Sequence, residues 1–552
     1  MNKIRFAVMI NGQVLRQWQV ESIEKILTET NSELVTYISN PTNGPASTSN
    51  LFQKLFRKNA LYTFLLNRTF RVPQDKQATV SSQIPVIECI PQQKGKYSEY
   101  FSTEDVTKIE GLQLDFILRF GYNILRGSIL NAAKYGIWSF HHGDERAFRG
   151  GPPGFWEIAK KAPSTGVILQ KLTNRLDSGN ILLRRDYITV SHSFSEMRQR
   201  LLAENTDMPM LAIRKYILNG QEMPEESDSQ AKIYQFPNNF RTLSFLFQLG
   251  CNRISFYFNR WFQFEDWRVV FGNHKIHKEA DIKELASSIY NCKHLIPEQK
   301  SHFYADPFLV KSGDNYTVLF EDYSYKDGTG CLSAWNNQTG LQPVMQKPTH
   351  VSYPYVFNYQ YSTWIIPEES ETDECRAYEW LDNKWSGNSF VLLNQPVVDP
   401  SMIEWEGKYY LFCGLKDDLP NEKLYVFYSE SFEGPYLPHF LNPVKVSAQG
   451  ARPGGSFFSM EEKTFRPAQV YKNYYGHNVL INKLIQLSSH VFDEVEFVSF
   501  SAEKFDKNAV GLHTLSIADN FVAFDIKTHR VGFRAFRMRL NEIRERKAKY
   551  DH

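Results

Sequence analysis

The sequence predicts an α/β domain with a parallel sheet, followed by an all-β five-bladed β-propeller. Residues 1–218 alternate strand-like and helix-like segments, which is typical of a parallel sheet covered by helices. From Trp267 onward, short aromatic and β-branched runs alternate with turn residues, which indicates an all-β domain. A weak repeat with several strands per unit runs through this second part, and such a repeat is typical of propeller blades.

The first domain begins with a buried apolar strand and an amphipathic helix, and further strands follow. The predicted strands are Phe6–Ile10, Leu34–Ile38, Leu114–Phe120 and Tyr135–His141, and the predicted helix is Trp18–Thr28. Open α/β sheets bind ligands beyond the carboxyl ends of their strands. The last of these strands ends at a histidine, His141, which is therefore placed where a catalytic residue is expected.

The domains are expected at residues 1–218 and 263–552, joined by residues 219–262. Residues 220–232 are polar and contain a proline and several serines, as in a linker. Residues 240–261 are rich in Phe, Leu and Ile, with three interspersed arginines. We expect a helix that docks between the domains, and the alternative is a basic amphipathic helix that lies on a membrane surface.

Five repeat units support five blades. Their prolines, followed by His513 in the last unit, are separated by 47, 46, 53 and 60 residues. Several units precede a second apolar strand, such as Tyr316–Glu321. The units are Ala305–Leu309, Ser352–Phe357, Val398–Ile403, Ala451–Gly455 and Leu512–Ser516.

Composition excludes several classes of protein. Lys and Arg number 63 against 61 Asp and Glu, so the chain lacks the basic field that a nucleic-acid partner requires. The six cysteines are scattered singly, which predicts reduced thiols and no metal site. The N-terminus does not resemble a signal peptide, and no run approaches the ~20 apolar residues of a transmembrane segment. We therefore expect a cytoplasmic protein.

Residues 139–182 contain the most specific motif. Ser139-Phe140-His141 is followed by Arg149-Gly150, by Thr-Gly-Val at 165–167 and by Leu-Asp-Ser-Gly-Asn-Ile-Leu at 176–182. In order and spacing this pattern resembles the folate-dependent formyltransferases of the methionyl-tRNA and sugar N-formyltransferase type. The resemblance implies a Rossmann-like fold for the first domain. The chain departs from the family at Ser139, where the family has asparagine.

The resemblance also implies a co-substrate and roles for individual residues. The formyl donor is expected to be 10-formyltetrahydrofolate, and the transfer passes through a tetrahedral oxyanion. His141 is expected to stabilise the oxyanion and protonate the departing folate nitrogen, Asp177 to take the proton of the attacking amine, and Ser139 to donate through its hydroxyl. The expected folate-binding residues are Phe120, Gly121, Tyr122, Arg149 and Gly150.

The second domain contains the short motifs Ala-Asp-Pro-Phe at 305–308, Phe-Glu-Asp at 320–322, Ile-Pro-Glu at 366–368 and Phe-Arg-Pro-Ala-Gln at 465–469. With these motifs it resembles the five-bladed propellers of glycoside hydrolase family 43 and, more closely, the N-terminal region of glucosamine inositolphosphorylceramide transferase. Carboxylates from equivalent strands are expected to meet near the axis, with basic residues that hold a phosphate or carboxylate. The candidate ligand-binding residues are Asp306, Glu321, Glu368, Asp399, Arg452, Arg466 and His513.

The leading hypothesis is that the first domain formylates the amine of a nucleotide-linked amino sugar in surface-glycan metabolism. The propeller would bind or process the glycan. One alternative is a retired formyltransferase fold with a propeller that binds carbohydrate or catalyses glycosyl transfer or hydrolysis. Another is hydrolysis of 10-formyltetrahydrofolate by water. The sequence leaves the oligomeric state open.

Overall fold

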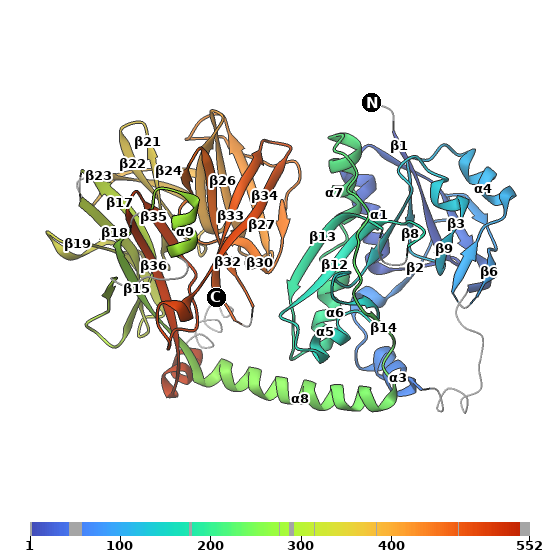
Figure 1. The fold of residues 1–552 in the computed structure, drawn as a ribbon, viewed down its shortest axis with the longest axis horizontal. Coiled ribbons are helices and arrows are strands. Elements are labelled where there is room, and N and C mark those ends of the chain that lie inside the picture. Colours follow the sequence, from blue (N-terminus) through green and yellow to red (C-terminus); the bar gives the residue numbers. More distant parts are fainter. Residues whose placement is uncertain are drawn as a thin grey trace. The chain divides into compact units, whose positions relative to one another are not determined.

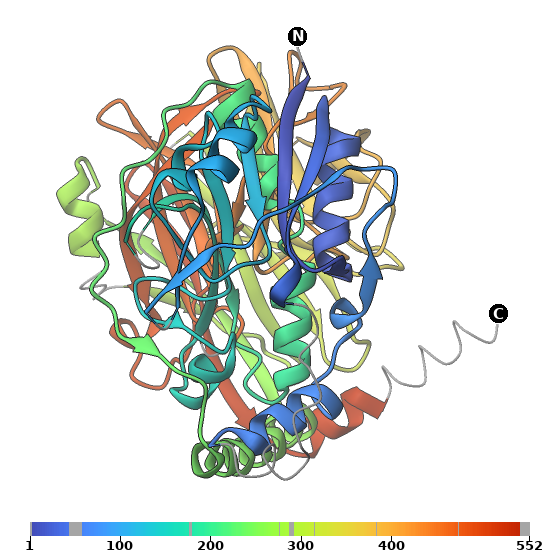
Figure 2. The same ribbon diagram turned by 90° about the vertical axis from the view of Figure 1, so that its right-hand side faces the viewer.

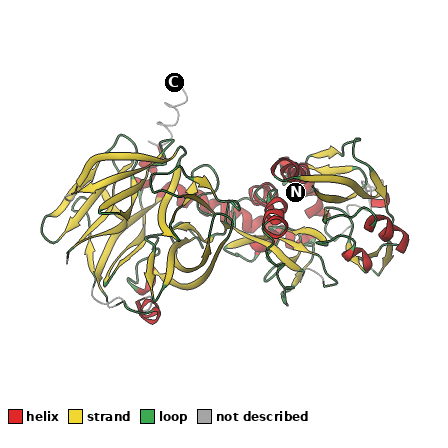
Figure 3. Cartoon of the chain, turned by 90° about the horizontal axis from the view of Figure 1, so that it is seen from above, coloured by secondary structure: helices red, strands yellow, loops and turns green. Residues whose placement is uncertain are grey.

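A computed structural model describes residues 3–43, 58–95, 97–175, 179–274, 276–285, 292–313, 315–381, 384–472 and 474–540. The chain divides into two compact units, Met1–Ile254 (unit 1) and Ser255–His552 (unit 2). The division falls within helix α8 (Asn239–Phe262), inside the segment expected to join the domains. Helices are concentrated in unit 1 and strands dominate unit 2 (Figures 1 and 3).

Unit 1 is an α/β domain built on a seven-stranded sheet with the order β13-β12-β10-β8-β1-β3-β5. Strands β10, β8, β1, β3 and β5 are parallel to one another, whereas β12 runs antiparallel to both β10 and β13. The predicted parallel sheet is thus confirmed on one side and carries an antiparallel hairpin on the other. The strands are β1 (Ile4–Asn11), β3 (Ser32–Asn40), β5 (Val86–Glu88), β8 (Phe116–Arg119), β10 (Ile137–His141), β12 (Ser164–Lys171) and β13 (Asn180–Ile188).

Helices cover this sheet. The predicted helix is α1 (Gln17–Glu29), which buries Trp18, Ile23 and Ile26 and runs beside the strands at the blue end of the chain (Figure 2). Helix α4 (Thr103–Glu110) packs Val106 and Ile109 into the cluster that contains Ile117 of β8. The other helices are α3 (Ala60–Arg68), α5 (Phe155–Ala159), α6 (Phe194–Ala203), α7 (Met208–Ala212), and the single turns η1 (Pro41–Asn43), η2 (Pro73–Asp75), η3 (Ser128–Asn131) and η4 (Ile213–Leu218).

Short strands outside the main sheet complete unit 1. Strand β11 pairs with β14, which comes from the segment predicted as a linker, so part of that segment is integrated into unit 1. These strands are β2 (Val14–Arg16), β4 (Gln77–Thr79), β6 (Gln92–Lys94), β7 (Ser98–Tyr100), β9 (Ile124–Arg126), β11 (Arg149–Gly150) and β14 (Ile233–Tyr234).

Unit 2 is an all-β unit whose described residues form five antiparallel sheets of four or five strands. Three sheets consist of consecutive strands. They are β17 (His302–Ser312), β18 (Asn315–Ser324), β19 (Thr329–Asn336) and β20 (Gly340–Met345); β21 (Ser352–Tyr359), β22 (Ser362–Glu368), β23 (Cys375–Leu381) and β24 (Lys384–Leu393); and β25 (Val397–Trp405), β26 (Lys408–Leu415), β27 (Lys423–Ser429), β28 (Leu437–Pro438) and β29 (Lys445–Val446).

The fourth sheet continues this pattern, and the fifth joins the two ends of the unit. The fourth contains β30 (Gln449–Pro453), β31 (Phe458–Met460), β32 (Lys463–Val470), β33 (Asn478–Leu487) and β34 (Phe492–Ser501). In the fifth, β15 (Gln263–Asn273) and β16 (Lys293–Leu295) combine with β35 (Leu515–Ala518) and β36 (Phe521–Val531). Strands β15 and β36 pair over their full length, so the beginning of unit 2 is bonded to its end.

The repeat units of the sequence fall on this sheet pattern. Four of them coincide with the first strands of sheets, namely β17, β21, β25 and β30, and the fifth leads into β35. The helical elements of unit 2 are α9 (Glu279–Leu285), η5 (Ala502–Lys504) and a helical segment at residues 533–540. No helix within the described ranges combines the length and apolar character needed to cross a membrane.

Candidate functional site

Ser139 and His141 lie on the same face of β10, because successive side chains of a strand alternate. Ser139 is buried, and Arg119 of the neighbouring strand β8 donates from Nη1 to its Oγ at 2.9 Å. The other terminal nitrogen of Arg119 donates to the carbonyl oxygens of Tyr122 and Asn123. One guanidinium therefore connects the serine to the loop that follows β8.

His141 lies at the carboxyl end of β10, as predicted, with Nε2 at 3.2 Å from the carbonyl oxygen of Phe148. The loop between them passes very close to the imidazole at Gly143. A Cβ atom at Gly143 would lie 2.8 Å from Nε2 of His141 and 2.6 Å from the oxygen of Phe148. Glycine is therefore required here for the loop and the imidazole to occupy their positions.

His142 belongs to the opposite face of the strand. Its ring packs against Trp18 and Phe140, with centroid distances of 5.2 and 5.9 Å. Burial and, to a smaller extent, the adjacent His141 together lower the pKa of His142 to about 3. His142 is therefore a neutral core residue that does not replace the asparagine of the formyltransferase pattern.

The loop Phe120-Gly121-Tyr122 is held tightly against the end of β1. A Cβ atom at Gly121 would lie 2.4 Å from the carbonyl carbon of Ile10. The amides of Phe120 and Gly121 donate to the Met9 carbonyl oxygen, and that of Tyr122 donates to Asn11 Oδ1. The three amides of the loop are thus engaged within the fold, and the Tyr122 carbonyl oxygen accepts from Arg119. The Phe120 ring packs beside Trp18 and Phe140, on the face opposite Ser139 and His141.

Arg149 and Gly150 form β11, and their positions are set by pairing with β14. Arg149 donates to the carbonyl oxygens of Ser229 and Ala231 at 3.4 Å. Gly150 has φ +84°, and a Cβ atom there would lie 2.2 Å from the carbonyl oxygen of Tyr234. The turn after His141 is thus fixed by backbone contacts. Asp177, the expected proton acceptor, lies outside the described residues.

In unit 2, the strands β17, β21 and β25 share an unusual backbone conformation at their repeat units. Asp306, Tyr353 and Asp399 each precede a proline and have φ between 46° and 52°, a region that non-glycine residues rarely occupy. Each lies where the pairing of its strand shifts register. Such backbone strain costs about 1–3 kcal/mol per residue and is concentrated at functional sites.

Asp306 forms a compact group with two residues from the end of the chain. His513 Nε2 lies 3.2 Å from Asp306 Oδ1, and His513 Nδ1 lies 2.7 Å from Asp525 Oδ2. Thr514 donates to Asp306 Oδ1 at 2.7 Å. Ligand atoms of Asp306, His513 and Asp525 all lie within 4.8 Å of one another, a set with the nitrogen and oxygen donors that divalent metals bind.

Asp399 anchors a second group. Arg452 Nε donates to Asp399 Oδ2 at 2.6 Å, and Gln469 Nε2 donates to the same oxygen at 2.5 Å. Glu368 accepts from the amide of Asp399 at 3.1 Å, and its Oε2 lies 3.9 Å from Nη2 of Arg452. Two carboxylates thus share one guanidinium.

Glu321 adds a further buried carboxylate. Its Oε1 lies 3.6 Å from Nε2 of His350. Gly330 makes room for it, because a Cβ atom there would lie 2.5 Å from Oε1 of Glu321. We call Asp306, Glu321, Glu368 and Asp399, together with Arg452 and His513, the carboxylate cluster.

The electrostatics of this cluster are those of a crowded buried site. Burial raises the pKa of Asp306 and Asp399, against the opposing effects of His513 and Arg452 respectively. Burial and the neighbouring carboxylates raise the pKa of Glu321 well above its usual value. Burial lowers the pKa of His513, but Asp525 and Asp306 outweigh it, so the net pKa is raised. These carboxyl groups can therefore hold protons near neutral pH.

Arg466 lies apart from the cluster. Its Nη2 and Nε donate to Glu494 at 2.7 and 2.8 Å, and Lys445 donates to the same carboxylate. Six of the seven residues predicted in unit 2 are thus linked, either by contacts or by the electrostatic influence of neighbouring carboxylates. Arg466 instead forms a buried structural ion pair with Glu494.

Sequence reasoning missed several residues that complete the sites. Arg119 had a weak signal, since it is a charged residue at the end of an apolar strand. Tyr353 had a stronger one, because it occupies the repeat position of Asp306 and Asp399. Gln469 belongs to the Phe-Arg-Pro-Ala-Gln motif, but no pattern connected it with Asp399. Asp525 had no signal, because its role depends on strands that meet only in three dimensions.

Comparisons with known proteins confirm both resemblances. Residues 270–515 match the family model described as glucosamine inositolphosphorylceramide transferase 1, N-terminal. The chain is 31% identical over 216 residues to glucosamine inositolphosphorylceramide transferase 1 of Oryza sativa subsp. japonica, covering 35% of this chain and 28% of that protein. It is 28% identical over 133 residues to methionyl-tRNA formyltransferase of Clostridium perfringens (strain 13 / Type A), covering 24% of this chain and 43% of that protein.

Solved structures give distant likenesses. Glycinamide ribonucleotide transformylase 1 from Symbiobacterium toebii has 17% identity and a TM-score of 0.29, covering 41% of this chain and 95% of that chain. A thermostable family-43 glycoside hydrolase has 13% identity and a TM-score of 0.29, and the match covers 35% of this chain and 74% of that chain. The chain spans less than half the length of the curated relatives described above.

Proposed function

We propose that unit 1 transfers a formyl group from 10-formyltetrahydrofolate to the amine of a nucleotide-linked amino sugar. The observation that carries this proposal is the placement of Ser139 and His141 on one face of β10, at the carboxyl end of a strand and beside the Arg119 guanidinium. The spacing of the formyltransferase motif and the similarity to methionyl-tRNA formyltransferase support it.

The residues present are suited to the chemistry of acyl transfer. The co-substrate supplies a formyl group on a nitrogen that can leave. As the amine attacks the formyl carbon, His141 and the Ser139 hydroxyl donate toward the developing oxyanion. Asp177 accepts the proton of the attacking amine, and His141 protonates the folate nitrogen as its bond to the formyl carbon breaks. The carbonyl oxygens of the loop 120–122 suit the N–H donors of a pterin ring.

The first experiment is a calorimetric titration of the full chain with a stable 10-formyltetrahydrofolate analogue, followed by formyl-transfer assays with nucleotide-linked amino sugars. His141→Ala should lower turnover by about 10²–10³-fold while folate affinity is retained. His142→Ala is the neighbouring control. Turnover that requires no amine would identify a formyltetrahydrofolate hydrolase, and absence of folate binding would identify a retired fold.

For unit 2 we propose a five-bladed propeller that binds or processes a glycan at the carboxylate cluster. Support comes from the five repeat units, the pairing of β15 with β36, and the match to the N-terminal model of a transferase whose name specifies glucosamine. Carboxyl groups with raised pKa values beside a guanidinium are suited to hydrogen bonds with sugar hydroxyls and to acid catalysis. Assays of the full chain for release or transfer of sugar from chromogenic glycosides would distinguish processing from binding.

A further inference from the structure

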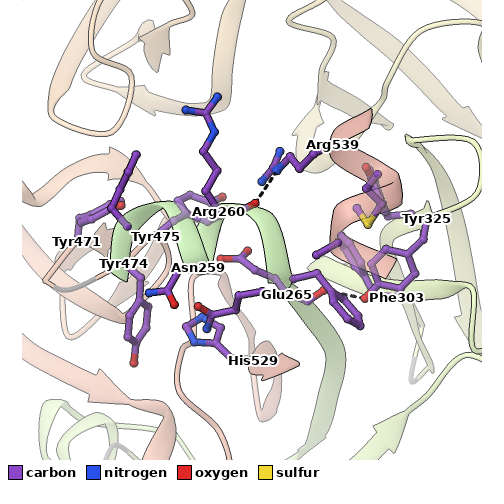
Figure 4. A pocket seen from close by; sticks show the side chains of 16 residues that line it. Asn259, Arg260, Glu265, Phe303, Tyr325, Tyr471, Tyr474, Tyr475, His529 and Arg539 are labelled. Carbon is purple, nitrogen blue, oxygen red and sulfur yellow. Dashed lines mark hydrogen bonds between the residues drawn. The ribbon is translucent and has the colours of Figure 1, made fainter. Parts of the chain in front are cut away.

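Unit 2 contains a cavity of about 650 Å³ that adjoins the carboxylate cluster (Figure 4). Its lining comes from the end of α8, the start of β15, the neighbouring ends of β17 and β18, the tyrosines 471, 474 and 475, His529 of β36, and the helical segment 533–540. The volume lies within the range of ~300–1,000 Å³ typical of small-molecule sites. None of the candidate residues named from the sequence lines this cavity.

Aromatic side chains form much of the lining. Phe303 and Tyr323 stack with a centroid distance of 4.7 Å and an interplanar angle of 16°, and Tyr325 packs edge-on against Phe303. The loop 471–475 contributes Tyr474 and Tyr475 (Figure 4). Rigid rings that combine an apolar face with a polar edge are suited to a saccharide, which presents C–H faces and hydroxyl edges.

The charged groups of the lining favour an anion. Arg260 and Arg539 contribute guanidinium groups, and Glu265 is the carboxylate among the lining residues. Glu265 is already neutralised, because it accepts from Lys527 Nζ at 2.8 Å and from Trp267 Nε1 at 3.1 Å. The described lining therefore presents two guanidinium groups beside one carboxylate that is already engaged, and Arg539 Nε donates to the Arg260 carbonyl oxygen at 3.3 Å. Guanidinium groups bind phosphate and carboxylate through paired hydrogen bonds.

Tyr475 connects the cavity to the carboxylate cluster. Its ring lies 4.9 Å from the Arg452 guanidinium carbon and 5.3 Å from the His513 ring. Arg452 in turn donates to Asp399. A ligand that contacts Tyr475 from the cavity is separated from the cluster by this single side chain.

We propose that this cavity binds a saccharide carrying an anionic group, phosphate or carboxylate, and holds it beside the carboxylate cluster. The proposal rests on the proposed saccharide-binding function of unit 2 and specifies the substrate class. The aromatic rings contact the sugar, while Arg260 and Arg539 contact the anionic group. Phosphate and carboxylate are distinguished by the probes of the experiment.

The experiment is calorimetric titration of the full chain with glucose 1-phosphate, glucuronic acid, methyl glucoside and inorganic phosphate. Arg260→Gln and Arg539→Gln should each weaken binding of the charged sugars by about 10-fold. Arg537→Gln is the matched control, because Arg537 is exposed on the same helical segment as Arg539 but does not line the cavity. Tyr323→Leu should weaken binding of the charged sugars and leave that of inorganic phosphate unchanged. Near-UV circular dichroism verifies that each variant is folded.

Tighter binding of the charged sugars than of either methyl glucoside or inorganic phosphate, with loss in both arginine variants, supports the proposal. If methyl glucoside binds as tightly as the charged sugars and the arginine variants do not weaken this binding, the proposed role of the anionic group is overturned. Binding that is lost in Glu321→Gln but kept in both arginine variants would place the saccharide in the carboxylate cluster and overturn the cavity assignment, while the proposed function stands. At about 10 mM sugar, even a Kd of about 1 mM gives near-saturation. If none of the sugars binds at this concentration, the cavity assignment and the proposed saccharide-binding function of unit 2 are both overturned.

Discussion

At the scale of single residues, Ser139 shows how a departure from a family motif is accommodated. A serine hydroxyl is shorter than an asparagine amide, and in this chain it accepts a hydrogen bond from Arg119. The hydroxyl in turn donates to the Phe140 carbonyl oxygen at a long 3.4 Å, and the Arg119 guanidinium places a positive charge beside the face of β10 that carries His141. Arg119 acts through Ser139 and is therefore a positioning residue.

Arg119→Ala should lower kcat for formyl transfer by roughly 10–100-fold, because the hydroxyl loses the donor that orients it. Arg119→Lys should recover part of this loss, since an ammonium retains the charge but not the forked geometry. The check is steady-state kinetics with the folate affinity measured in parallel. An equal loss in both variants, accompanied by a lower Tm, would indicate a purely structural role.

A second residue-scale prediction concerns Glu321 in unit 2. Burial raises its pKa, so the folded protein is destabilised at any pH where this carboxyl group must be ionised. Glu321→Gln should raise the free energy of unfolding of unit 2 by about 1 kcal/mol at alkaline pH. The difference should shrink as the pH falls through the folded pKa, because the wild-type side chain is then neutral.

Urea denaturation of both proteins at a series of pH values measures this difference. Glu374→Gln is the control, since that glutamate is more exposed and its substitution should have a small effect at every pH. A variant that is less stable than the wild type at alkaline pH would contradict the prediction and show that the carboxylate is stabilised in the fold.

At the scale of elements, helix α8 has an unusual exposed face. Phe240, Leu243, Phe247 and Ile254 recur at helical spacing and are 79%, 57%, 77% and 73% exposed. The helix contains arginines and no acidic residue. A cationic helix with exposed aromatic side chains is suited to the surface of an anionic membrane, the alternative considered from the sequence.

We expect the protein to co-sediment with vesicles that contain phosphatidylserine and to do so less at high salt. Replacing Phe240 and Phe247 together with serine should lower the vesicle partition coefficient by up to about 10³-fold, because each buried aromatic side chain contributes about 2 kcal/mol. Tyr361→Ser, at an exposed turn of unit 2, is the control. Equal sedimentation of all three proteins would assign the helix face to another role.

At the scale of the whole molecule, unit 2 depends on contacts between its two ends. Asp525 of β36 accepts hydrogen bonds from the amides of Asp306, His513 and Thr514 and lies against the His513 ring. Asp306 is in the first repeat unit, and the other two are in the last. One buried carboxylate therefore connects both ends of the all-β unit in addition to the β15–β36 pairing.

Asp525→Ala should lower the free energy of unfolding of unit 2 by about 3 kcal/mol or more, because several buried donors lose their acceptor at once. Asp519→Ala, in the same hairpin but 56% exposed at the side chain, should change it by less than about 1 kcal/mol. Calorimetric melting of the full chain measures both. A similar change in the two variants would show that Asp525 does not join the ends of the unit.

The sequence by itself determined the order of the elements and the residues of both candidate sites that belong to local patterns. Short apolar runs predicted β1, β3, β8 and β10, because such a run is a local signal of a buried strand. The repeat units predicted that Asp306 and Asp399 occupy equivalent positions, since equivalent sequence folds into equivalent strands.

Only the tertiary structure decided which side chains meet. Arg466 has the same local signals as Arg452, yet Glu494, 28 residues further on, holds it in a structural ion pair. Asp525 reaches Asp306 across 219 residues because β36 pairs with β15. The direction of β12 and the cavity lined by Tyr475 and Arg539 likewise depend on segments distant in the sequence. Burial and pairing of charges are set by such long-range neighbours, and no local pattern encodes them.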